Sequence, residues 1–215
     1  MTRPFAAASL DAIRVVPGEA FEIRPVRLHF GVESFGVNAY TAPSAGGRVI
    51  EEHDELGAGA GRHEELYIVA RGHAVFELAG EEVEAPAGTL IFVRDPAVRR
   101  GAIAKEDATT VLVVGGVVGQ PFQPSPWETW LGAFPFIEAG EPERGVELFL
   151  QALESHPGNA NVLYNLACFE SLAGHGEAAL GHLTEAIELD PRMLGWAQTD
   201  SDFDAIREEP GFPKA

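Results

Sequence analysis

The hydrophobic pattern of the chain changes at one proline-rich stretch, and this change constrains the fold more than any other feature. Before the stretch, short runs rich in Val, Ile, Tyr and Phe alternate with turn residues. After it, apolar residues recur with a helical period. Residues 119–126 contain Pro121, Pro124 and Pro126, which favour extended backbone and cannot donate to a strand ladder. We therefore predict two domains, residues 1–118 and 127–215, joined by a linker over residues 119–126.

The first domain is predicted to be all-β. Short β-rich runs follow one another between Phe21 and Gly116, and no helical period lies between them. These runs are FEIRPVRLHF, FGVNAYTA, RVIEEH, ELYIVA, HAVFEL, TLIFV and TTVLVVGG. Strands of this length and spacing are typical of a sandwich or a barrel.

Two turns in this domain resemble those of the cupin family. In cupins a strand led by glutamate ends in a glycine turn, and a Pro-x-Gly turn opens the next long strand. The matching segments here are Glu65 to Gly72 and Pro86-Ala87-Gly88. The resemblance covers roughly residues 20–118 and implies a jelly-roll barrel that is open at one end. Many cupins dimerise through their sheets, so the resemblance also implies a homodimer.

The resemblance further implies a place for a metal site. Cupins usually bind metal through His-x-His and Glu of the first motif and a further His of the second. The nearest match here is His53 with Glu55, followed by His63 and Glu65, and we call these four residues the His–Glu set. Side chains two apart on a strand share a face, so both pairs could point into the barrel. Such a set would suit iron, manganese, nickel or zinc.

The second motif departs from the family pattern, because Arg99 stands where the fourth ligand is expected. An arginine stays protonated and cannot donate a lone pair to a metal. Three interpretations stay open: Arg99 pairs with Glu65 in the place of a metal, the His–Glu set forms a rearranged metal site, or Arg99 builds an anion-binding pocket. In the last case Tyr67 and Glu65 are the other candidate ligand-binding residues. On a regular strand Arg100 would point to the opposite face.

The second domain contains a repeat that appears when positions 34 apart are compared. Residue types agree in six pairs, namely Ala133 and Ala167, Gly140 and Gly174, Gly145 and Ala179, Phe149 and Leu183, Ala152 and Ala186, and Pro157 and Pro191. The spacing is similar to the tetratricopeptide repeat and is clearest from Asn161 to Pro191. It implies an all-α array of helical hairpins, a module that could contact a protein partner. Residues 196–212 resemble a truncated closing unit.

Charge and composition limit the partners and the location of the chain. The net charge of −18 repels the phosphates of nucleic acids and the surfaces of anionic lipids. No run approaches the roughly 18 apolar residues that a membrane-spanning helix requires. The single cysteine, Cys168, cannot form an internal disulfide, and the first residues lack the apolar run of a signal peptide. We expect a cytoplasmic protein.

These observations predict a small-molecule-binding cupin of non-enzymatic or regulatory type. It would bind a small anionic metabolite without a metal cofactor, and its helical domain would serve dimerisation or contact with a protein. The alternative is a metal-dependent cupin enzyme, an oxygenase, isomerase or lyase, that uses the His–Glu set with a divalent transition metal. Whether a reaction is catalysed stays open, since cupins host unrelated chemistries.

Overall fold

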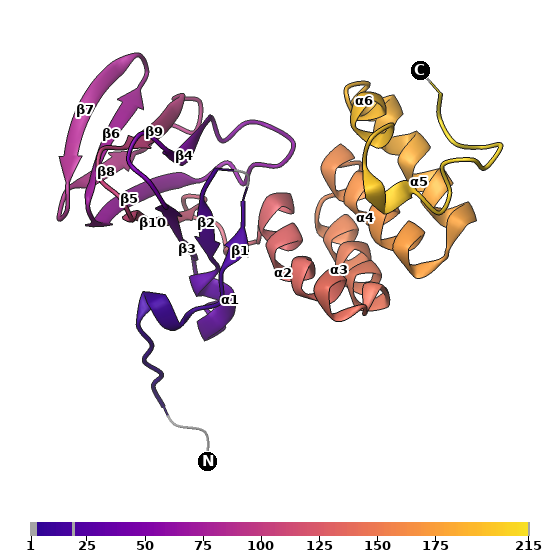
Figure 1. Ribbon diagram of the computed structural model, residues 1–215, viewed down its shortest axis with the longest axis horizontal. Helices are drawn as coiled ribbons and strands as arrows, with labels where there is room; N and C mark the ends of the chain where they lie inside the picture. The colour runs from indigo at the N-terminus through magenta and orange to yellow at the C-terminus, as the bar shows by residue number, and fades with distance from the viewer. Residues whose placement is uncertain (1–3, 19, 215) are drawn as a thin grey trace. The chain divides into compact units, whose positions relative to one another are not determined.

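The computed structural model describes residues 4–18 and 20–214 (Figure 1). The chain divides into two compact units, Met1–Pro124 and Ser125–Ala215. Strands make up most of the first unit, and helices make up the second. Within the described residues, no helix combines the length and the apolar character needed to cross a membrane.

The N-terminal unit consists of two antiparallel sheets that stack on each other. One sheet has six strands in the order β1-β2-β3-β10-β5-β8, and the other has four in the order β4-β9-β6-β7. The strands are β1 Val16–Pro17, β2 Glu22–Arg24, β3 Gly36–Ala42, β4 Arg48–His53, β5 Glu64–Arg71, β6 His73–Leu78, β7 Glu81–Pro86, β8 Leu90–Val93, β9 Arg100–Ala104 and β10 Thr109–Gly116. The predicted all-β fold is present. The predicted barrel is not, because the two sheets form an open sandwich.

The main core of this unit lies between the two sheets. Strand β5 shows the pattern that produces it, since Glu65, Tyr67 and Val69 are buried while the residues between them are only half-buried. Side chains from both sheets meet in one cluster, which contains Ala42, Val49, Ile50, Tyr67, Val69, Ala74, Phe76, Ala85, Ile91, Val93, Ala102, Ala104 and Val111. Glu65 is therefore a carboxylate on the inner face of a β-sandwich.

One predicted strand is interrupted. The run from Phe21 to Phe30 was expected to be extended, but β2 ends at Arg24 and a short helix, α1, covers Val26–Phe30. Pro25 precedes the helix and has no N–H for a strand ladder. Gly31 ends the helix with φ of 67°, in the left-handed region that glycine adopts readily. The prediction of a continuous strand is therefore wrong here.

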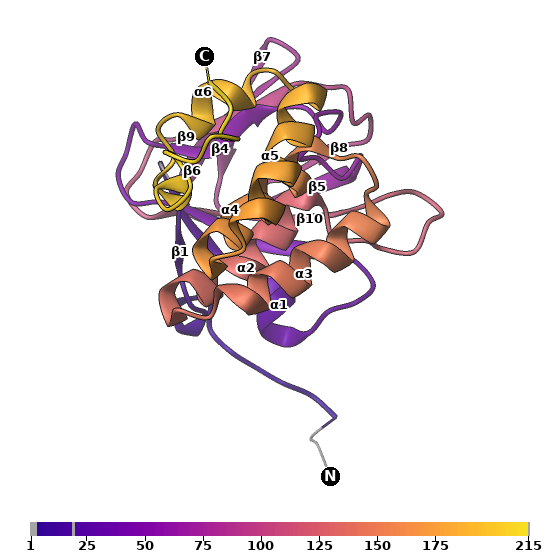
Figure 2. The ribbon, with the colours of Figure 1, turned by 90° about the vertical axis from the view of Figure 1, so that its right-hand side faces the viewer.

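The C-terminal unit contains four helices of 14 residues each (Figure 2). They are α2 Pro126–Ala139, α3 Pro142–Ser155, α4 Ala160–Ala173 and α5 Gly176–Leu189. Helix α4 starts at residue 160 and α2 at residue 126, so the helices have the 34-residue offset seen in the sequence. Gly140 and Gly174 end α2 and α4 with φ of 67° and 82°.

The array is closed by a short final segment. Helix α6 covers Met193–Ala197, and a 3₁₀ turn covers Ser201–Phe203. Phe203 and Phe212 from this segment are buried in the same cluster as Leu163 and Leu183 of α4 and α5. Burial of these rings completes a core that the hairpin of α4 and α5 cannot close alone.

Candidate functional site

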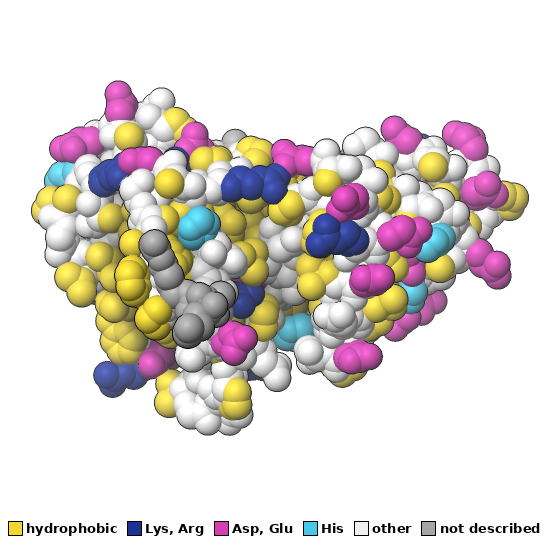
Figure 3. Space-filling view, turned by 90° about the horizontal axis from the view of Figure 1, so that it is seen from below, with side chains coloured by type: hydrophobic (Ala, Val, Ile, Leu, Met, Phe, Trp, Pro, Cys, Tyr) yellow, Lys and Arg dark blue, Asp and Glu magenta, His cyan; other side chains and the backbone are white. Residues whose placement is uncertain are grey.

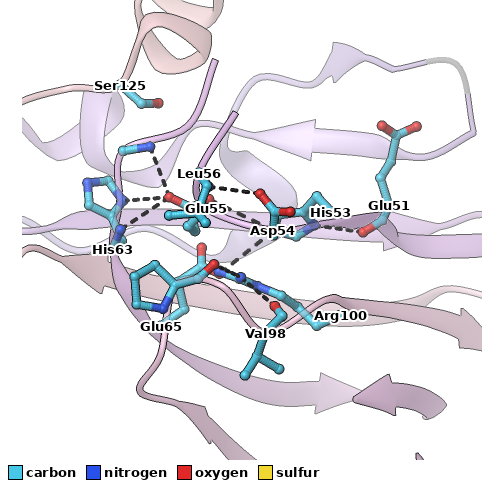
Figure 4. Close-up of polar contacts among 12 residues, drawn as sticks. Glu51, His53, Asp54, Glu55, Leu56, His63, Glu65, Val98, Arg100 and Ser125 are labelled. Atoms are coloured by element: carbon cyan, nitrogen blue, oxygen red, sulfur yellow. Dashed lines mark hydrogen bonds and ion pairs between the residues drawn. The ribbon is translucent and has the colours of Figure 1, made fainter. Parts of the chain in front are cut away.

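The candidate site lies where the inner faces of the two sheets approach each other. His53, the last residue of β4, is the cross-strand neighbour of Arg100, the first residue of β9. Glu65 and Tyr67 lie on β5 of the opposite sheet. Figure 4 shows Glu65 and Arg100 directed toward each other, with His53 and Glu55 beside them.

Arg100 is the buried cation of the site, and its side chain is 0% exposed. Its Nη2 and Nε donate to Oε2 of Glu65 at 2.6 and 3.2 Å, and Nε also lies 3.1 Å from the hydroxyl of Tyr67. Nη1 donates to the carbonyl oxygens of Pro96 and Val98 at 3.1 and 2.8 Å. The guanidinium is therefore held inside the protein and offers little to a ligand.

The predicted position of Arg99 is wrong. Arg99 does not pair with Glu65; it pairs with Glu52 at 2.6 Å, and its side chain is 61% exposed. The prediction assumed one regular strand from the Pro-x-Gly turn onward, but β8 ends at Val93 and a turn precedes β9. The turn shifts the alternation by one residue, so Arg100 points inward and Arg99 outward. Arg99 lines a surface hollow of about 390 Å³ together with Glu52.

Glu65 is held as a carboxylate. Burial alone would raise its pKa, but the neighbouring His53, the Tyr67 hydroxyl and Arg100 together lower the pKa to about 2. The hydroxyl of Tyr67 donates to Oε2 of Glu65 at 2.5 Å. Burial, reinforced by the charge of Glu65, raises the pKa of Tyr67 far above its usual value. Tyr67 is therefore a neutral hydrogen-bond donor at physiological pH.

His53 presents one ring nitrogen to two carboxylates. Its Nδ1 lies 2.7 Å from the carbonyl oxygen of Glu51, and because a carbonyl can only accept, Nδ1 carries the hydrogen. Nε2 lies 3.9 Å from Oε1 of Glu55 and 3.8 Å from Oε2 of Glu65. Burial opposes protonation of this ring, but Glu65 and the Glu51 carbonyl outweigh burial and raise the pKa of His53. The side chain is 33% exposed, so the site is open on this side.

Glu55 organises the glycine-rich loop that follows β4. Its Oε2 accepts hydrogen bonds from the backbone N–H groups of Gly61 and His63, at 2.9 and 3.3 Å. A Cβ on Gly61 would lie 2.2 Å from the imidazole of His63, so a larger residue here would displace the His63 ring. The His63 ring packs on Phe122 with 5.7 Å between ring centroids. The loop is therefore tied to the sandwich by the same carboxylate that faces His53.

The structure brings three members of the His–Glu set together. His53, Glu55 and Glu65 each offer a ligand atom within 4.8 Å of the others. His63 lies on the other side of Glu55, with Nδ1 3.8 Å from Oε2, and is outside this group of three. One imidazole and two carboxylates form a donor set that suits a divalent transition metal. Sequence reasoning missed Arg100, because the turn that aims it inward carries no residue pattern beyond Asp95-Pro96.

Comparison with known proteins finds similarities to both parts of the chain. Residues 148–188 match the family model of the tetratricopeptide repeat. Similar solved structures include KdgF from Halomonas sp., at 17% identity, TM-score 0.41, and coverage of 49% of this chain and 88% of that one. No curated protein sequence matches the chain.

Two further similar structures are described as cupins. One is a sugar phosphate isomerase of the cupin superfamily from Silicibacter pomeroyi, at 19% identity, TM-score 0.42, and coverage of 51% of this chain and 74% of that one. The other is an RmlC-like cupin from Shewanella frigidimarina, at 14% identity, TM-score 0.41, and coverage of 55% and 95%. Identities at this level say nothing about a reaction.

Proposed function

We propose that the N-terminal unit binds a divalent transition metal through His53, Glu55 and Glu65, and that this centre binds a small anionic molecule. The observation that carries the proposal is the orientation of the His53 ring. Its Nδ1 hydrogen is held by a backbone carbonyl, and its Nε2 faces two carboxylate oxygens. Histidines that bind metals commonly donate their other N–H in this way.

The distances around Nε2 favour a metal over a proton. A proton on Nε2 would form a hydrogen bond of about 2.8 Å to one of the oxygens. Both oxygens instead lie 3.8 to 3.9 Å from Nε2. Two ligand atoms that each lie about 2.1 Å from one ion are roughly 3 to 4 Å apart. The spacing of His53, Glu55 and Glu65 therefore matches ligands of a shared ion.

The charges of the site support an anionic ligand. Glu55 and Glu65 carry two negative charges and Arg100 carries one positive charge. His53 must be neutral to bind a metal, so one negative charge would then be uncompensated. A divalent cation would make the site positive by one charge, which favours an anion. Bound there, the metal would act as a Lewis acid toward an oxygen of the ligand. The ligand would approach from the side of His53, where the site is exposed.

Arg100 has a positioning role in this proposal. Together with Tyr67 it holds Oε2 of Glu65, and so fixes the carboxylate oxygen that lies 3.8 Å from Nε2 of His53. Because its side chain is fully buried, Arg100 does not contact the ligand itself. In this proposal the positive charge that attracts the anion would come from the metal, whereas one interpretation of the sequence assigned that role to Arg99.

The proposal is tested by elemental analysis of protein that carries no histidine tag and is purified without added metal. We expect close to one equivalent of iron, manganese, nickel or zinc, with loss of this metal in His53→Ala and Glu55→Gln. His73→Ala is the matched control, because His73 also pairs with a glutamate in the same unit, Glu84, at 2.6 Å. Metal-free protein, or metal that survives both variants, would overturn the proposal.

A further inference from the structure

Asn38 on strand β3 points into the sandwich. Its chain neighbours Val37 and Ala39 belong to a buried cluster that strand β10 and the N-terminal segment complete on the outer side of the six-stranded sheet. Figure 3 views the molecule from this outer side and shows hydrophobic side chains gathered on the N-terminal unit. Because side chains alternate along a strand, Asn38 lies on the opposite, inner face. This is the face that carries Glu65 and Tyr67.

The strand registers place Asn38 in line with a residue of the candidate site. Asn38 is the cross-strand neighbour of Val113 on β10, and Val113 is in turn the neighbour of Tyr67 on β5. Two strand spacings, about 10 Å, separate Asn38 from Tyr67. The next row of the inner face consists of Gly36, Gly115 and Glu65. Between Asn38 and the two site residues, the only side chain in these rows is therefore that of Val113.

The inner face is accessible beside these rows. Val113 packs against the core between the sheets but is only half-buried. Strand β4, whose last residue is His53, contacts both β3 and β10, and the His53 side chain is 33% exposed. His63 and Phe122 lie over the two glycines and border this region at the ends of the strands. The exposed side of the candidate site therefore continues from His53 toward Asn38.

The carboxamide of Asn38 is buried without a full set of hydrogen bonds. The residue is 7% exposed, and its Oδ1 is shielded from solvent with no hydrogen-bond partner among the described residues. A buried polar atom in this state costs stability, and native proteins contain few of them. An apolar residue at this position would avoid the cost. The cost therefore indicates a polar partner that joins Asn38 when the site is filled.

We propose that Asn38 binds a hydroxyl group of the small anionic ligand, so that this ligand is a hydroxy acid. The inference rests on the metal centre proposed above, which would hold the acid group of the same molecule. A carboxamide both donates and accepts hydrogen bonds, and a hydroxyl does the same, so each group satisfies the other. The distance from Asn38 to the site requires a chain of several atoms between the acid group and the hydroxyl.

The charges around Asn38 favour one carboxylate and an uncharged far end. With a divalent metal the site carries one positive charge, which a single carboxylate neutralises, whereas a phosphate monoester brings a charge of about −1.5 to −2. The other residues in the two rows beside Asn38 include no cation, and the hydroxyl of Tyr67 is neutral. Arg100 is occupied by Glu65 and is 0% exposed. A second anionic group would therefore meet no opposite charge at Asn38.

The test compares acids with and without a hydroxyl by titration calorimetry on the zinc-loaded full chain. The probes are γ-hydroxybutyrate against butyrate, and ε-hydroxycaproate against caproate. We expect the hydroxy acid of at least one pair to bind roughly fivefold more tightly, the effect of about one hydrogen bond, and we expect Asn38→Leu to abolish this preference. Thr41→Val is the matched control and should keep the preference. Thr41 is an 8% exposed polar residue of the same strand whose hydroxyl binds that of Thr110 on the outer face.

The outcomes separate the role of Asn38 from the metal centre. If the protein binds zinc but shows no preference for either hydroxy acid, or if Asn38→Leu keeps the preference, the role of Asn38 is refuted and the metal centre stands. A chain that binds no zinc would overturn both. Metal-free Asn38→Leu should melt at the same temperature as the unmodified protein or higher, because it removes an unpaired buried atom. A lower melting temperature would show that the carboxamide serves the fold, and this also would overturn the inference.

Discussion

Replacement of Arg100 by Met should destabilise the N-terminal unit by about 3 to 5 kcal/mol, the usual effect of leaving one partner of a buried ion pair alone. The structure supports the upper part of this range, because the guanidinium also satisfies two backbone carbonyls that would lose their donors. The lowered pKa of Glu65 leads to a similar figure. A shift of this pKa from 4.5 to about 2 corresponds to about 3 kcal/mol of folding stability. This stabilisation is present above pH 4.5 and is lost as the pH falls toward 2.

Hydrogen exchange followed by mass spectrometry measures this effect separately in each unit. Amides of β5 and β9 should lose protection in Arg100→Met, while those of α4 in the other unit serve as the internal reference. Arg99→Met is the matched control, and it should change stability by less than about 1 kcal/mol, because its ion pair with Glu52 is exposed. Adding Glu65→Gln to Arg100→Met should recover part of the loss. Equal effects of the two arginine substitutions would refute the reasoning.

Two predictions concern the helical unit, whose urea unfolding can be followed by the fluorescence of the chain's three tryptophans, all of which lie there. Gly145→Ala should lower the free energy of unfolding by about 1 to 3 kcal/mol, because its Cβ would lie 2.0 Å from the Phe169 ring. Gly181→Ala, with open space at its Cβ, should raise it by up to about 1 kcal/mol. Burial, with the charges of Asp200 and Asp204, raises the pKa of Asp202 to about 6, so ionisation opposes folding above that pH. Asp202→Asn should raise the free energy of unfolding of the helical unit by about 1 kcal/mol at pH 8, a figure reduced for the partial exposure of the side chain. It should have no such effect at pH 4. Equal effects at the two pH values would contradict this prediction.

The repeat was predictable because the residues that end its helices and the small residues at its helix contacts are both visible in the local sequence. Helix α4 starts at Ala160, directly after its cap Asn159, and Gly174 ends it, and the equivalent glycine ends α2. Small residues such as Gly145 and Ala179 recur at the helix contacts, so sequence spacing alone indicates the period. The strands of the sandwich were also predictable from local sequence, because apolar and polar residues alternate within each run.

The arrangement of the site was less predictable, because it depends on contacts between distant strands. The turn before β9 decides which of Arg99 and Arg100 points into the sandwich. A shift of one residue along the strand moves a side chain from the inner face to the outer face. The Glu51 carbonyl that orients His53 belongs to the backbone, which no residue pattern reveals. Glu55 lies close to His53 because its carboxylate binds the backbone of Gly61. The residue types of a site can be read from sequence, but their alignment depends on turns and loops.

The most direct test of the central claim is nitrogen NMR of the His53 ring, recorded across a pH titration with and without one equivalent of Zn²⁺. The account predicts that Nδ1 keeps its hydrogen throughout, that Nε2 titrates in metal-free protein, and that zinc abolishes this titration and shifts the Nε2 resonance. The ring of His73, whose partner Glu84 lies on the outer strand β7, is the control, and its nitrogen resonances should be the same with and without zinc. A His53 Nε2 that titrates identically with and without zinc would contradict the proposed metal centre.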